Sequence, residues 1–254
     1  MLGIGLGLSP PRQLNAFSPL DGFANGESGL WLSPSTASAF TDTGGTTPVT
    51  AGTDAARVND LSGNDWHVTQ GTAAARPTFQ QADGYDYLDF DGADDVMATA
   101  LTDFPMYSMA ISFRFFTGAA YAGIVTAPDW ATDTGASLAL GMDNTPGTSL
   151  FLGQSANFNL FAGATSFVVN GVAQSAAPIT LVDNTDYIII GDARNYGGNA
   201  YLNDGLQIGR DRPSGARHAT IRLYDLVTSD AVWSDDYRAQ LQTYLSTRNP
   251  GVDL

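Results

Sequence analysis

Alternating hydrophobic and polar positions recur along most of the chain and predict a protein built from short β-strands. Between residues 107 and 115, large apolar side chains alternate with small or polar ones, which places one face on a core and the other toward solvent. Residues 137–142 and 220–227 repeat this pattern. Residues 187–190 form a short continuous apolar run instead, which predicts a strand that is buried on both faces.

One hairpin and one helix stand out from these strands. The pair Asn170-Gly171 lies between the apolar residues 167–169 and Val172, and Asn-Gly is the strongest short signal for a hairpin turn. Near the C-terminus, Ser234 is suited to cap a helix, and Pro250 ends the helical pattern. The apolar stripe of this predicted helix consists of Tyr237, Leu241, Tyr244 and Leu245.

Together these elements predict an all-β protein. Many short strands separated by Gly, Asn, Asp and Pro turns are typical of a β-sandwich or jelly roll. We find neither an internal repeat nor a linker long enough to separate two domains, so residues 27–254 are predicted to form one sandwich with a single C-terminal helix. Residues 1–26 lack the alternation and are predicted to form an extended N-terminal arm.

The composition excludes several classes of protein. The 254 residues include 11 basic residues, all of them Arg, and 26 acidic ones, of which 25 are Asp, for a net charge of −15. This excess argues against a nucleic-acid partner, because such proteins neutralise phosphates with clusters of Lys and Arg. The absence of cysteine excludes disulfides, thiol catalysis and Cys-ligated metals. No apolar stretch is long enough for membrane insertion, and the first residues do not suit a signal peptide.

Three stretches carry a resemblance to a known family. They are the segment Gly29-Leu-Trp-Leu-Ser-Pro-Ser with Gly-Thr-Thr-Pro-Val-Thr50 at its end, the segment Val58-Asn-Asp-Leu-Ser-Gly-Asn followed by Ala75-Arg-Pro-Thr78 and Leu88-Asp-Phe-Asp-Gly, and the strand at 220–227 that leads into the helix. They resemble the concanavalin A-like (laminin-G-like) jelly-roll sandwich domains of bacteriophage and prophage particles. The resemblance covers most of residues 29–100 and 220–248.

The resemblance implies a non-enzymatic virion structural protein, a tail, fibre, spike or decoration component that is made in the host bacterial cytoplasm. It would contact other virion proteins and copies of itself. The Gly-rich arm gives a means of docking, because small residues let a segment lie flat against a partner or add to a sheet edge. Its anchoring side chains would be Leu2, Ile4, Leu6 and Leu8. The alternative is a carbohydrate-binding attachment module that recognises a host cell-surface glycan.

A glycan hydrolase is the third hypothesis. Retaining glycosidases need two carboxyl groups about 5–5.5 Å apart, and the laminarinase-type branch of this fold takes them from a strand motif with two Glu residues. Here Glu27 is the only glutamate, so that motif is absent. No Asp pair is singled out by the sequence, and we therefore expect the chain not to be an enzyme and to require no cofactor.

The sharpest cluster of acidic residues lies in one turn. It consists of Asp89, Asp91, Asp94 and Asp95, and several oxygens at short range suit a hard cation such as Ca²⁺. Strand alternation sends Asp89 and Asp91 to the same face and the pair Asp94 and Asp95 to solvent. A Ca²⁺ loop with a bidentate Glu is not present, and the ordinary role of Asp in turns is the competing interpretation.

The loop-like stretch 192–214 contains the residue types that sugars favour. Planar amides, aromatic rings and Arg side chains bind sugar hydroxyls and ring faces, but they also occur in protein interfaces. A glycan site, a subunit contact and a plain connecting loop therefore remain open. The candidate ligand-binding residues are Arg194, Tyr196, Asn199, Tyr201 and Arg210, with Trp130 as a further aromatic platform.

Overall fold

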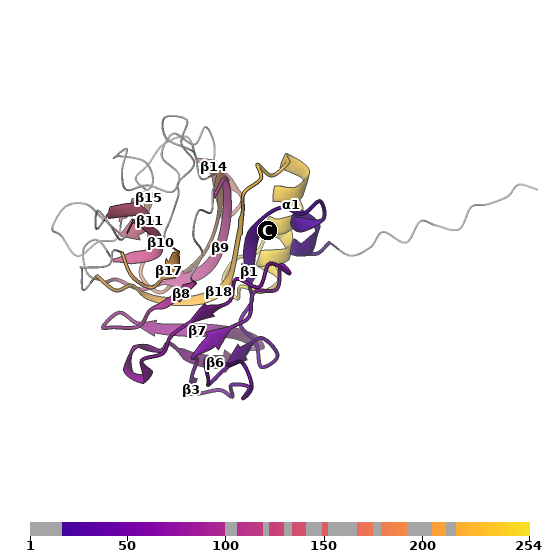
Figure 1. Cartoon of the computed structure of the whole chain (residues 1–254). Helices are drawn as coiled ribbons and strands as arrows, with labels where there is room; N and C mark the ends of the chain where they lie inside the picture. The colour runs from indigo at the N-terminus through magenta and orange to yellow at the C-terminus, as the bar shows by residue number, and fades with distance from the viewer. Residues whose placement is uncertain are drawn as a thin grey trace, which may run out of the picture.

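Two antiparallel sheets face each other in a computed structural model of the chain, with an α-helix on the outside (Figure 1). The structure describes residues 17–99, 106–118, 122–129, 134–140, 149–151, 167–174, 179–192, 205–211 and 217–254. The predicted all-β sandwich with a C-terminal helix is confirmed. In the described ranges, no helix has the length and the apolar character that a membrane span requires.

The first sheet, here called sheet A, is built around strand β18. Its order is β14-β13-β16-β9-β18-β7-β6-β3. Strand β18 has β9 on one side; on its other side, the N-terminal half pairs with β7 and the C-terminal half pairs with β1. The strands of this sheet are β1 (Gly29–Leu32), β3 (Thr53–Asp54), β6 (Thr78–Ala82), β7 (Tyr85–Asp91), β9 (Ser108–Phe115), β13 (Phe167–Val169), β14 (Val172–Gln174), β16 (Thr185–Asp192) and β18 (Thr220–Ser229).

The second sheet, sheet B, has the order β15-β12-β11-β10-β17-β8-β5-β4-β2. Its strands are β2 (Ala39–Phe40), β4 (Arg57–Val58), β5 (Val68–Thr69), β8 (Met97–Thr99), β10 (Gly123–Asp129), β11 (Thr134–Leu140), β12 (Ser149–Phe151), β15 (Ile179–Thr180) and β17 (Leu206–Ile208). The two sheets enclose one hydrophobic core, in which Phe90 and Phe113 of sheet A and Val125 and Ile208 of sheet B are fully buried.

Strand β9 confirms the predicted alternation and corrects its consequence. Met109, Ile111, Phe113 and Phe115 point into the core, as the period of two predicts. The opposite face does not meet solvent over most of its length: Ser108, Ala110 and Ser112 are fully buried as well. Their burial follows from the position of the C-terminal helix, which covers part of the outer face of sheet A (Figure 1).

Helix α1 (Asp235–Ser246) begins where the sequence predicts. The Ser234 side chain accepts a hydrogen bond from the Tyr237 N–H, and Asp235 and Asp236 lie at the positive end of the helix dipole. Leu241 and Leu245 are buried against Ile188 and Ile190 of β16. Strand β16 is therefore buried on both faces, as predicted from its continuous apolar run.

Part of the predicted N-terminal arm packs against this helix. Pro19–Phe23 forms a 3-10 turn (η1), capped by Ser18. Phe17 and Phe23 belong to the apolar cluster beneath α1, and the Tyr237 hydroxyl donates to the Pro19 carbonyl at 2.9 Å. The rest of the arm, with Leu2, Ile4, Leu6 and Leu8, lies outside the described residues. A second 3-10 helix in the described ranges, η2, consists of Ala73–Ala75 and precedes β6.

Candidate functional site

An acidic cleft lies at the β3–β6–β7 side of sheet A. Its volume is about 410 Å³. Four of its side chains are carboxylic acids, and the remaining polar ones are an Arg, an amide and two hydroxyls. The lining residues are Asp54, Ala73, Ala74, Arg76, Thr78, Gln80, Asp89, Phe90, Asp91, Asp95 and Thr220.

Strand register brings these residues together. Asp54 of β3 is paired with Thr78 of β6, and Thr78 is paired with Asp89 of β7. Two residues further along β7, Asp91 is paired with Thr220 of β18. Because side chains two apart on a strand point to the same face, Asp89 and Asp91 both line the cleft, as the sequence predicts.

The turn after β7 fixes the acidic groups. One Asp91 carboxylate oxygen accepts hydrogen bonds from the N–H groups of Ala93 at 2.7 Å and Asp94 at 3.4 Å, and Gly92 adopts a positive φ of 77°. The Asp95 carboxylate accepts from the Asp91 N–H at 2.8 Å. The expectation that Asp94 and Asp95 both face solvent is therefore half wrong: Asp94 is exposed, but Asp95 is 5% exposed because its carboxylate folds back onto the backbone of β7.

Burial and the repulsion between neighbouring carboxylates raise the pKa of two of these carboxyl groups. Burial is the main cause that raises the pKa of Asp95 to about 6, and the nearby carboxylates of Asp91, Asp94 and Asp54 raise it further. Burial also raises the pKa of Asp89, although the Arg222 guanidinium partly offsets this. The cleft thus contains a carboxyl group that holds its proton up to about pH 6 beside others that are more exposed.

Arg76 supplies the positive charge of the cleft and is fixed by its surroundings. Its Nε donates to the Gln70 carbonyl at 3.0 Å, and its guanidinium also donates to the Gly71 carbonyl at 3.1 Å and the Thr41 carbonyl at 3.4 Å. The turn and this segment are tied together, because the Val96 N–H donates to the Ala75 carbonyl at 3.1 Å. The cleft is therefore held by backbone hydrogen bonds on both of its sides.

A row of charged residues continues from the cleft across the outer face of sheet A. Asp89 is paired in register with Arg222, and Arg222 with Arg114, which is paired with Asp186. Arg222 lies 3.7 Å from Asp89, and its guanidinium stacks on the Tyr87 ring at 5.0 Å. The Nε of Arg114 donates to both carboxylate oxygens of the buried Asp186 at 3.1 Å.

Sequence reasoning found one half of this site. It singled out Asp89, Asp91 and Asp95 of the cleft, with Asp94 beside them, but missed Asp54 of β3, Gln80 of β6 and Arg76, which follows η2. Of the predicted ligand-binding residues, Arg210 is described: it is partly buried after β17, and its carbonyl accepts from the Thr126 hydroxyl at 2.7 Å. Trp130, Arg194, Tyr196, Asn199 and Tyr201 lie outside the described residues.

Three of the four predicted cation ligands lie close together. Oxygen atoms of Asp91, Asp94 and Asp95 lie within 4.8 Å of one another, which is compatible with binding of a hard cation. Asp89 is not part of this group and lies beside Arg222 instead. The same three carboxyl groups also have the close spacing that a pair of catalytic acids requires, so geometry allows both kinds of chemistry.

Comparison with known proteins gives a fold and not a family. No family model matches the sequence, and no curated protein sequence matches it. Among solved structures, an arabinofuranosidase complexed with arabinofuranosyl-alpha-1,2-xylobiose is similar over 93% of this chain and 66% of that chain, with 16% identity and a TM-score of 0.53. Trypanosoma rangeli sialidase in complex with sialic acid is similar over 90% of this chain and 34% of that chain, with 11% identity and a TM-score of 0.50.

This likeness corrects the prediction of a non-enzymatic virion structural protein. The two similar structures named above are an arabinofuranosidase and a sialidase, and this finding contradicts the expectations of a non-enzymatic virion component and of a chain that is not an enzyme. The sequence lacks the motif with two Glu residues and singles out no Asp pair, whereas the cleft brings together four Asp residues from separate segments of the chain. The chain spans less than two thirds of the length of the arabinofuranosidase, and the predictions about location and partners are not addressed by the likeness.

Proposed function

We propose that the chain is a glycan hydrolase domain whose acidic cleft is the active site. One observation carries this proposal: Asp95 has a pKa raised to about 6 and an oxygen within 4.8 Å of one on Asp91. This upper limit on the distance between their oxygens is compatible with the separation of about 5–5.5 Å between the two carboxyl groups of retaining glycosidases. The enzymatic function of the similarly folded solved structures supports the same interpretation.

In this proposal Asp95 is the general acid and Asp91 the nucleophile. The protonated Asp95 donates its proton to the glycosidic oxygen, and the bond between that oxygen and the anomeric carbon breaks. The Asp91 carboxylate attacks the anomeric carbon from the opposite face and forms a glycosyl ester. Asp95, now ionised, then takes a proton from water, which attacks the ester and releases the sugar with its original anomeric configuration.

The other polar groups of the cleft bind the sugar. Arg76, Gln80 and Thr220 line it and offer hydrogen-bond donors for ring hydroxyls. Asp89, whose pKa is also raised by burial, lies on the same strand face as Asp91 and accepts hydrogen bonds from the substrate. Because the cleft holds four acids and one Arg, it favours neutral over acidic sugars.

Hydrolysis of a panel of aryl glycosides, arabinofuranosides included, tests this proposal with three variants. Asp95→Asn and Asp91→Asn are each expected to reduce kcat/KM by at least about 100-fold, the usual contribution of a general acid or nucleophile. Asp94→Asn is the matched control, because it removes an exposed carboxylate from the same turn. It should retain most of the activity and shift the alkaline limb of the pH profile to lower pH, since Asp94 helps to raise the pKa of Asp95.

Two outcomes would contradict the assignment. One is a wild-type protein that cleaves no glycoside of the panel although it is folded. The other is an Asp95→Asn variant with wild-type activity. Added Ca²⁺ tests whether the same turn binds a cation instead. A Ca²⁺ ion bound by Asp91, Asp94 and Asp95 would keep Asp95 ionised, and an ionised Asp95 cannot act as the general acid. Added Ca²⁺ should therefore inhibit hydrolysis, and EDTA should not.

A further inference from the structure

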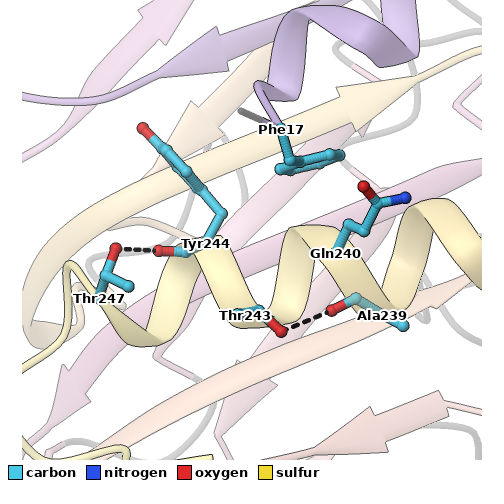
Figure 2. A pocket seen from close by; sticks show the side chains of 6 residues that line it. All are labelled: Phe17, Ala239, Gln240, Thr243, Tyr244 and Thr247. Atoms are coloured by element: carbon cyan, nitrogen blue, oxygen red, sulfur yellow. Dashed lines mark hydrogen bonds between the residues drawn. The ribbon is translucent and has the colours of Figure 1, made fainter. Parts of the chain in front are cut away.

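A second hollow in the molecule is apolar and lies along helix α1. This groove, the α1 groove, has a volume of about 370 Å³ (Figure 2). Its lining residues are Phe17, Ala239, Gln240, Thr243, Tyr244 and Thr247. The groove lies on the outer side of sheet A, away from the core. It shares no residue with the acidic cleft.

The polar groups of the α1 groove are largely satisfied by the helix itself. The Thr243 hydroxyl donates to the Ala239 carbonyl at 3.0 Å, and the Thr247 hydroxyl donates to the Tyr244 carbonyl at 2.7 Å (Figure 2). These hydroxyls need no partner from a ligand. The surface that remains therefore suits apolar side chains and offers little to a polar ligand.

Phe17 forms one wall of the groove and is fixed there by aromatic contacts. Its ring lies 5.4 Å from the Tyr237 ring and 6.3 Å from the Tyr244 ring, both edge to face. Phe17 is also the first described residue of the arm and lies two residues before η1 begins at Pro19. Residues 1–16 are therefore joined to the chain at a residue that lines the groove.

The sequence of the arm matches the groove in chemistry and in spacing. Leu2, Ile4, Leu6 and Leu8 alternate with Gly, so an extended segment would carry all four apolar side chains on one face, about 6.6 Å apart. Ala239, Thr243 and Thr247 follow each other at intervals of four residues, about 6 Å along the helix, so two or three of the four side chains can lie along the stretch between Ala239 and Thr247. Residues 9–16 reach up to about 26 Å when extended, which exceeds the groove length of about 12 Å between Ala239 and Thr247.

We infer that the α1 groove binds the apolar side chains of residues 2–8 of the same chain. The short connection favours this occupant over a second copy, because it gives the tethered segment an effective concentration in the millimolar range. Residues 2–8 would then bind to α1 of their own chain and not to a neighbouring molecule. This inference does not depend on the proposed hydrolase activity.

Disulfide trapping tests the inference directly, because the chain has no cysteine of its own. The test protein carries Leu6→Cys with Thr243→Cys. The matched control carries Leu6→Cys with Ala51→Cys, since Ala51 is exposed in the turn before β3, which lies at the opposite end of sheet A from the strands that α1 covers. Under mild oxidation at micromolar protein, the test pair should form an intramolecular disulfide at least about tenfold faster than the control pair.

Equal rates for the two pairs, or a disulfide-linked dimer as the main product of the test pair, would overturn the inference. Melting under reducing conditions establishes first that both proteins are folded. A second measurement avoids Cys substitutions altogether: deletion of residues 2–8 should expose the groove and increase the binding of an apolar dye. Unchanged dye binding by the deleted protein would overturn the inference as well.

Discussion

At the scale of single residues, Asp95 shows how the acidic turn gives one carboxyl group two opposing roles. Its side chain accepts the Asp91 N–H and so completes the turn. The same position is buried and surrounded by other acids, which raises its pKa to about 6. Ionisation of Asp95 therefore destabilises the folded protein, while a proton retained near pH 6 is what a general acid needs.

Replacement of this residue should consequently make the protein more stable above pH 6. The folded protein binds more protons than the unfolded chain while the pH rises from about 4 to about 6, so the free energy of unfolding falls over this range. Asp95→Asn keeps an acceptor for the Asp91 N–H and removes the charge. We expect it to raise the free energy of unfolding by roughly 1–3 kcal/mol at about pH 8 and to have little effect at about pH 4.

Urea unfolding of wild type and Asp95→Asn at the two pH values measures this difference, with Asp94→Asn as the control. Asp94 is exposed, so its replacement should change stability by less at both values. A variant that is less stable than wild type at the higher pH would show that the Asp95 charge is compensated in the folded protein, for instance by a bound cation.

The sequence predicts the residues of one strand but not those that meet it. Alternation alone places Asp89 and Asp91 on a common face. It cannot show that Asp95 turns inward, because this depends on a hydrogen bond to the backbone of β7. Asp54 and Arg76 belong to segments whose pairing with β7 is decided by the whole sheet, and no local pattern marks them as neighbours of the turn.

At the scale of elements, an ion pair holds the end of helix α1 to sheet A, in addition to the apolar contacts of the helix. Asp225 of β18 is fully buried and accepts hydrogen bonds from Arg248 Nε at 2.9 Å and Trp31 Nε1 at 3.4 Å. Arg248 follows the helix directly, so this pair fixes the end of α1 against β18. Burial raises the pKa of Asp225, and Arg248 offsets part of the effect.

Arg248→Met should leave the Asp225 charge buried without its cationic partner. Removal of one member of a buried ion pair costs about 3–5 kcal/mol, and we expect a loss near 3 kcal/mol in the free energy of unfolding at neutral pH. The loss should shrink in acid, where Asp225 becomes protonated. The double variant Asp225→Asn with Arg248→Met should recover much of the stability; a double variant as unstable as the single one would contradict this account.

The elements themselves were largely predictable, whereas their environments were not. The hairpin at Asn170-Gly171 forms, with both residues at positive φ, because the turn chemistry is local. The capped helix and the core face of β9 are equally local in origin. The burial of Ser108 and Ser112 was not predicted, since it arises from α1, which is far away in the sequence.

At the scale of the whole molecule, negative charges greatly outnumber positive ones. The 26 acidic residues exceed the 11 basic ones, for a net charge of −15. Some acids are paired with Arg, as in Arg114–Asp186 and Arg217–Asp211. The excess remains, and the mutual repulsion of so many carboxylates opposes the compact state.

Salt should therefore stabilise the protein. A change from about 0.01 M to about 1 M NaCl shortens the Debye length from about 30 Å to about 3 Å and screens this repulsion. We expect the Tm to rise by about 5 °C or more, measured by calorimetry at neutral pH. The same comparison at about pH 4, where much of the negative charge is lost, is the control and should give a smaller rise. A Tm that falls with salt at neutral pH would mean that the ion pairs outweigh the repulsion.

The central position of β18 also has a consequence for how the protein is made. This strand pairs with β1, β7 and β9, and its partner β1 precedes it by about two hundred residues (Gly29 pairs with Ser229). During translation, β7 and β9 therefore leave the ribosome long before the strand that lies between them. Until β18 follows, their apolar faces and unpaired edges are open to other nascent chains. Sheet A can close only after β18 has been synthesised, so a chaperone that protects the incomplete chain would raise the yield of folded protein.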